Sequence, residues 1–170
     1  MAIQLQVKRG VEANRPALAD GEFYYSTDSK RVFIGSTPSG LPVRAASVNL
    51  SAQGAAISAT PLLTPSTTGF YRISAYLKVT RAATTSSTMG AVTITFTDGV
   101  DSVAQSLVLG LMTQAGAVAT TNTGNATTSK LCGTAVIYAK AGVAIQYAVA
   151  YTTSGTTSMQ YELNLSCEAL

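Results

Sequence analysis

The stretch MQYELNLSCE, residues 159–168, indicates the fold class because apolar and polar residues alternate along its whole length. A period of two is typical of a β-strand with one buried face, since successive side chains point to opposite sides of a sheet. The two alternating sets are Met159, Tyr161, Leu163, Leu165 and Cys167 on one side, and Gln160, Glu162, Asn164, Ser166 and Glu168 on the other. We therefore predict a last strand that packs one face against a core.

Four segments upstream repeat this pattern, at residues 71–79, 92–97, 103–111 and 145–151. Two residues interrupt it: Tyr76 falls among the polar positions of the first segment, and Gln105 among the apolar positions of the third. Gly, Ser and Thr turns separate the segments, with no convincing amphipathic helix between them. Short alternating strands of this kind favour an antiparallel β-sandwich over a parallel α/β sheet, and among sandwiches a jelly-roll-like topology.

The composition agrees with an all-β fold. Ala, Thr, Ser and Gly make up 81 of the 170 residues and only 19 residues are charged, a balance that favours sheets and turns. With 46% apolar residues and a net charge of +3, the chain can bury a core. The length allows one full domain and a smaller appendage.

Residues 1–44 differ from the rest and are predicted to form a separate unit, followed by a sandwich domain over 45–170. They hold 10 of the 19 charges and three of the five prolines. Residues 3–7 alternate as a strand, and a hairpin is expected over 23–34 with its polar tip at 26–30. A hairpin this small is marginal alone, so its apolar residues must be buried by the C-terminal domain, a sister subunit or another protein.

The residues that usually carry chemistry are scarce. The chain has no His and no Trp, which removes the usual general base and the commonest metal ligand. Asp98 and Asp101 offer too few oxygens for calcium and are expected to stabilise a turn. Cys132 and Cys167 are expected to be separate thiols, with a disulfide between neighbouring strands as the alternative. We expect no enzyme activity, no catalytic or metal-binding residue and no cofactor.

Charge and hydropathy limit the partners. Basic residues form no stripe, so no nucleic-acid partner is expected. No window approaches 18 consecutive apolar residues, and the start lacks an apolar signal core, so we expect a soluble protein without membrane insertion or secretion signal. Residues 114–129 show no periodicity and are predicted to be a long surface loop that either contacts a partner or has no such role.

The stretch QVKRGVEANRPALADGEFYYSTDSKRVFIG, residues 6–35, resembles the N-terminal module of tailed-phage tropism determinants, phage hyaluronidases and tail-fibre proteins. The shared features are an Arg-Gly after the first strand, a Leu followed by Asp-Gly-Glu, and a Thr-Asp hairpin that ends in an apolar residue and Gly. The resemblance implies a module that intertwines in a trimer at the virion-proximal end of the protein.

Two shorter stretches, LTPSTTGFYRISA at 63–75 and AKAGVAI at 139–145, are similar to strand openings in the trimeric jelly rolls of the complement globular-head and tumour-necrosis-factor superfamily. Fold similarity of this kind implies little about a ligand.

Together with the resemblance of residues 6–35, these patterns predict a non-enzymatic phage virion protein, assembled in the host cytoplasm as a homotrimer with a small N-terminal docking module and a projecting β-sandwich. Its role is that of a short tail fibre or receptor-binding protein; a capsid decoration or head-fibre protein and a stand-alone carbohydrate-binding lectin are the alternatives. Its partners would be other virion proteins and a host-surface glycan or protein. The expected docking and trimer-interface residues are Val7, Arg9, Phe23, Tyr25, Val32 and Ile34.

Overall fold

The computed structural model describes residues 8–11, 23–27, 32–34, 43–109, 111–112, 118–119, 121–122, 126–127 and 129–170. The chain divides into two compact units, Met1–Leu41 and Pro42–Leu170. The boundary predicted after residue 44 falls inside the first strand of the second unit, β4 (Val43–Gln53).

The N-terminal unit contains a three-stranded sheet in the order β1-β2-β3. Its strands are β1 (Lys8–Gly10), β2 (Phe23–Ser26) and β3 (Val32–Ile34). The pair β2–β3 is the antiparallel hairpin expected from the sequence, whereas β1 pairs with β2 in parallel. The strand predicted over 3–7 lies mostly outside the described residues, and the described β1 begins at Lys8.

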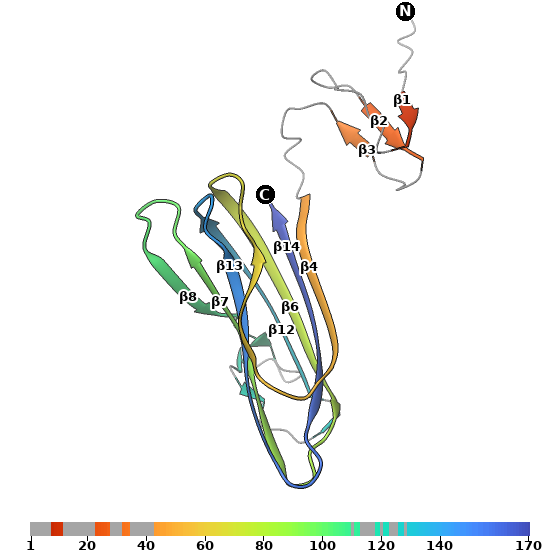
Figure 1. Ribbon diagram of the computed structural model, residues 1–170, viewed down its shortest axis with the longest axis vertical. Helices are drawn as coiled ribbons and strands as arrows, with labels where there is room; N and C mark the ends of the chain where they lie inside the picture. Colours follow the sequence, from red (N-terminus) through yellow and green to blue (C-terminus); the bar gives the residue numbers. More distant parts are fainter. Residues whose placement is uncertain are drawn as a thin grey trace, which may run out of the picture. The chain divides into compact units, whose positions relative to one another are not determined.

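The second unit is an antiparallel sandwich of two sheets (Figure 1). The first, which we call sheet I, has the order β12-β6-β14-β4, with β12 at Lys130–Ala139, β6 at Gly69–Arg81 and β14 at Gln160–Ala169. The second, sheet II, is built on β7 (Ser86–Thr97), β13 (Ile145–Ser154) and β5 (Ile57–Leu63). The strands β8 (Ala104–Val108) and β11 (Thr121–Asn122) also pair with β7.

The strand order is that of a jelly roll. Along the chain, β4, β6, β12 and β14 join sheet I while β5, β7, β8 and β13 join sheet II, so almost every connection crosses from one sheet to the other. Each sheet thus takes its four main strands from both halves of the domain, which is the arrangement of two interleaved Greek keys. The predicted all-β class and antiparallel sandwich are confirmed.

The core lies between the two sheets and is formed by the apolar residues of the predicted alternating pattern. In β6 the alternating positions from Tyr71 to Val79 are all buried, and the residues between them are half-buried on the outer face. In β14 the alternating positions from Tyr161 to Cys167 are also buried, and Leu163 lies fully buried between Leu77 of β6 and Leu50 of β4. The largest fully buried side chains are Tyr161, Ile73, Leu77, Met89, Ile94, Leu109, Leu131, Ile145, Met159, Leu163 and Val79.

The prediction of a long surface loop over 114–129 is wrong in part. Val118–Ala119 forms β10, which pairs with β9 (Leu111–Met112), and β11 pairs with β7. Backbone pairing therefore creates strands where the side chains show no period, because two-residue strands are too short to display one. Residues 113–117, 120, 123–125 and 128 lie outside the described part of the chain.

Two turns at the ends of the sandwich depend on particular residues. Gly155, between β13 and β14, has φ 102°, and a Cβ there would lie 2.7 Å from Oγ1 of Thr85, so the position requires glycine. Asp98 and Asp101 follow β7, and their carboxylates accept hydrogen bonds from the backbone of Val100 and Val103 at 2.7 and 2.9 Å. The two carboxylates thus hold the predicted turn.

Candidate functional site

The sheet register brings most of the predicted docking residues to one side of the N-terminal sheet. Arg9 pairs with Tyr25, Tyr25 pairs with Val32, and Phe23 pairs with Ile34. Paired positions and positions two apart along a strand share a face, so these five positions form one group. Arg9 is exposed, and Phe23 and Tyr25 are half-buried. Val7 lies outside the described residues, and burial between chains stays a prediction.

The opposite face of the same sheet is closed around Tyr24, which is 2% exposed. Its hydroxyl donates a hydrogen bond to the backbone oxygen of Val11 at 2.8 Å. A Cβ on Gly10 would lie 2.6 Å from that hydroxyl oxygen, so the Arg-Gly step leaves room for the tyrosine. Ser26 is also buried. The N-terminal sheet therefore has one filled face and one half-open aromatic face.

A second candidate surface is the outer face of sheet I, away from the sandwich core. Cross-strand pairing arranges its residues in rows that run perpendicular to the strands. One row contains Thr134, Ser74, Ser166 and Ser47, and the row beside it contains Cys132, Tyr76, Asn164 and Asn49. The side chains of the first row are short, so they form the floor of a shallow surface.

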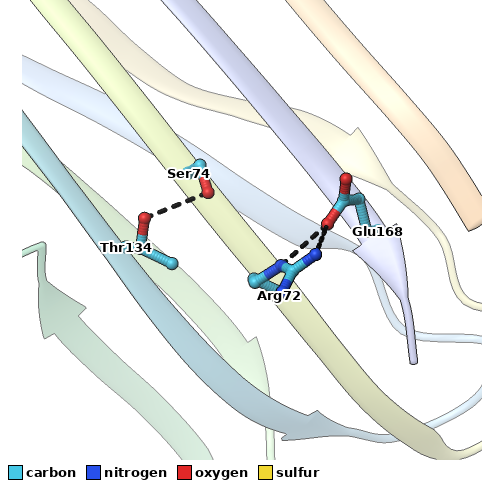
Figure 2. Close-up of polar contacts among 4 residues, drawn as sticks. All are labelled: Arg72, Ser74, Thr134 and Glu168. Atoms are coloured by element: carbon cyan, nitrogen blue, oxygen red, sulfur yellow. Dashed lines mark hydrogen bonds and ion pairs between the residues drawn. The ribbon is translucent and has the colours of Figure 1, made fainter. Parts of the chain in front are cut away.

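Charged residues border this floor on one side, as Figure 2 shows for the strands β6 and β14. Nε of Arg72 donates to Oε2 of Glu168 at 2.8 Å, and Nη2 donates to the same oxygen. In the adjacent row the hydroxyls of Ser74 and Thr134 share a hydrogen bond of 3.0 Å. Arg44 of β4 pairs with Glu168 in the backbone register but has no ion pair among the described residues.

The floor and its borders enclose a depression of about 290 Å³ over β4, β14 and β6. Its polar lining comes from the hydroxyl row, from Arg44 and from the row of Asn49, Asn164 and Tyr76. Tyr76 is the residue that the sequence set apart, because it occupies a polar-face position in an otherwise regular strand. The strand register shows that two asparagines lie beside Tyr76 in the same row.

Apolar side chains are exposed at the β6 start and β14 end of the same outer face. Phe70 is 56% exposed, Val136 55% and Leu170 51%. The ring of Phe70 contacts that of Tyr138 with centroids 4.8 Å apart, and the backbone nitrogen of Leu170 donates to the oxygen of Phe70. We call Phe70, Val136, Tyr138 and Leu170 the apolar cluster; no local pattern in the sequence marks it.

The two cysteines lie on opposite faces of sheet I, which excludes the alternative of a disulfide between them. Cys132 is exposed in the Tyr76 row, whereas Cys167 is fully buried beside Ile73. Burial, followed by the neighbouring Glu168, raises the pKa of the Cys167 thiol to about 11. A buried thiol with so high a pKa is a core residue rather than a nucleophile.

The tyrosines expected in the core are placed there. Tyr71, Tyr147 and Tyr161 are buried, and Tyr151 is half-buried with its hydroxyl bound to the backbone oxygen of Met159. Burial, with smaller contributions from Tyr151 and Tyr147, raises the pKa of Tyr161 to about 12. Its hydroxyl donates to the backbone oxygen of Ala55 at 2.8 Å.

Within the described ranges, no three His, Cys, Asp or Glu side chains gather in a way that could hold a metal ion. The same residues include no helix with the length and apolarity needed to cross a bilayer.

No family model and no curated protein sequence matches the chain. Among solved structures, the chain is similar to the CBM22-1–GH10 modules of the Clostridium thermocellum endo-1,4-beta-D-xylanase 10B, determined in complex with xylohexaose. The identity is 10% and the TM-score 0.29; the match covers 74% of this chain and 25% of that chain, so this chain spans a quarter of the xylanase chain. A similarity at this level does not establish a shared function.

Proposed function

We propose that the chain is a non-enzymatic structural protein of a phage virion, in which three copies form a surface projection of the short tail-fibre or receptor-binding type. The N-terminal unit would dock the projection to the particle, and the sandwich would extend from it. The observation that carries the proposal is the half-open face of the N-terminal sheet, where Phe23 and Tyr25 stay partly exposed beside Arg9. The resemblance of residues 6–35 to a trimerising phage module supports the same assignment.

The apolar cluster on the sandwich gives independent support for self-association. Exposed Phe, Val and Leu side chains that gather at one end of a sheet face are typical of surfaces that another protein covers. A trimer could cover both this cluster and the N-terminal aromatic face in one assembly, and would also protect strand edges from pairing with other molecules.

Sedimentation of the full chain tests the trimer. We expect a single species with three times the mass of one chain, and we expect Tyr25→Ser to shift it toward the monomer because the substitution removes an aromatic contact from the interface. Tyr76→Ser is the matched control, since it makes the same chemical change on the outer face of sheet I. A monomeric wild-type protein contradicts the proposal.

Copy number distinguishes the two virion positions. A capsid decoration protein would be present in hundreds of copies per particle and a tail protein in a few to dozens, as quantitative mass spectrometry of purified particles would measure. Labelled antibody on intact particles, viewed by electron microscopy, would locate the projection. Absence of the chain from purified particles contradicts both positions.

A further inference from the structure

The depression on sheet I has the size and lining of a small-ligand site. Its volume of about 290 Å³ is close to the lower end of the range of about 300–1,000 Å³ common for such sites. Its floor of Ser47, Ser166 and Ser74 is polar, in contrast to the apolar cluster at the end of the same face. A second protein chain would gain most binding free energy by covering the apolar cluster. The depression is then left for a ligand rich in polar groups.

The hydrogen-bonding side chains beside this floor are available to a ligand. The side chains of Asn49, Asn164 and Tyr76 take part in no hydrogen bond with any described residue, although all three face the depression. An asparagine amide offers two donors and an acceptor, and a tyrosine hydroxyl offers one donor and accepts as well. Three such groups in one row, one per strand, are spaced about 4.8 Å apart by the sheet itself.

This set of groups matches the chemistry of a carbohydrate. Sugar hydroxyls need donors and acceptors together, which amide and hydroxyl side chains supply. The C–H groups of a sugar ring carry partial positive charge and pack favourably on the negative face of an aromatic ring. Tyr76 is the aromatic side chain that lines the depression.

We propose that the depression on sheet I binds a carbohydrate chain of the host surface, with a sugar ring on Tyr76 and its hydroxyls bonded to Asn49 and Asn164. The host as the source of the carbohydrate rests on the proposed function, whereas the binding itself is a property of the sandwich. Arg72 and Glu168 neutralise each other, so Arg44 is the charge that lines the depression without an anionic partner among the described side chains. The site therefore favours a chain with a carboxylate sugar, which a guanidinium can bind through two hydrogen bonds.

The test uses the full chain and soluble oligomers of glucose, mannose, galactose, N-acetylglucosamine and galacturonic acid, with affinity measured by calorimetry. We expect at least one oligomer to bind, and galacturonic acid to bind most tightly. Tyr76→Ala should weaken binding by about tenfold or more, and Tyr76→Phe should retain most of it because the ring remains. Arg44→Gln should remove the preference for galacturonic acid and leave neutral oligomers unaffected.

Gln146→Ala is the matched control, because Gln146 lines a depression of about 300 Å³ on sheet II. It should leave binding unchanged, and thermal unfolding should show that every variant keeps its fold. Lack of binding by all five oligomers at millimolar concentration overturns the proposal, as does binding that Tyr76→Ala and Asn164→Ala leave unchanged.

Sedimentation of the same variants separates this proposal from the trimer. If Tyr76→Ala dissociates the assembly, the depression itself is an interface between copies and the carbohydrate proposal is overturned. If Tyr25→Ser dissociates the assembly while carbohydrate still binds, both proposals are supported. A monomer that binds carbohydrate supports the site and contradicts the trimer.

Discussion

The sandwich and the N-terminal unit are both made of β-strands, but they differ in how their strands are covered. Each main strand of the sandwich has seven or more residues, apart from β8, and turns an apolar face into a core shared by two sheets. The N-terminal strands have three or four residues each, and of their described side chains only Tyr24 and Ser26 are buried. The sandwich thus buries most of its apolar strand faces within one chain and leaves the apolar cluster exposed at one end, whereas the small unit leaves a whole aromatic face for a partner.

A cavity in the sandwich core is the most severe change we consider. Leu163 is fully buried between Leu77 and Leu50, so Leu163→Ala should lower the free energy of unfolding by about 2–5 kcal/mol. Asn164 is the next residue and lies on the opposite face, so Asn164→Ala should change the free energy of unfolding by no more than about 0.5 kcal/mol. Denaturant unfolding of the purified chain measures both. Equal effects of the two substitutions would mean that β14 does not separate a core from a solvent face.

Removal of the buried tyrosine in the small unit tests whether the two regions are independent. Tyr24→Ala should disrupt the N-terminal sheet, because Tyr24 fills one of its faces and binds Val11. The midpoint of sandwich unfolding should change little, while the fraction of trimer measured by sedimentation should fall sharply. A loss of sandwich stability as large as that of Leu163→Ala would contradict this independence.

The sequence predicted the strands whose alternation is regular, and it did not single out those with other patterns. The regular periods of β6, β13 and β14 mark faces that are buried in the structure. β4 and β12 are edge strands of sheet I, and their local patterns are weak because β4 carries Ala and Ser on both faces and β12 places the apolar Val136 and Tyr138 on its outer face. Their strand character comes from pairing with β14 and β6, which a local pattern does not contain.

Of the two candidate sites, one was predicted from the sequence and the other was not. The sequence indicated Phe23 and Tyr25 because apolar residues in a marginal hairpin require cover, and Arg9 through the resemblance to the phage module. The register of three short strands then placed them on one face. The depression on sheet I was not predicted, since it depends on residues from β4, β6 and β14 that lie far apart in the chain. The available signal was Tyr76, an aromatic residue at a polar-face position. Only the cross-strand register shows that Asn164 and Asn49 continue its row.

Alkaline pH should weaken the sandwich through two buried groups. Burial raises the pKa of Cys167 from 9.0 to about 11 and that of Tyr161 from 10.0 to about 12. Below pH 9 both groups are protonated in the folded and the unfolded chain, so their contribution to stability is fully present. As the pH rises from about 9 to 12, the unfolded chain releases these protons first, and the free energy of unfolding therefore falls.

Unfolding curves between pH 8 and 12 measure this slope. Tyr161→Phe should make this slope less steep above pH 10. At neutral pH it should lower the free energy of unfolding by about 0.5–1.5 kcal/mol, because the hydrogen bond to Ala55 is lost. Cys167→Ala should flatten the slope between pH 9 and 11. Ile73→Val is the control, since it removes a methylene group beside Cys167 without removing a titrating group, and should lower the whole curve while keeping its shape. A wild-type slope that neither Tyr161→Phe nor Cys167→Ala reduces would show that both groups ionise equally well in the folded sandwich, contrary to their burial.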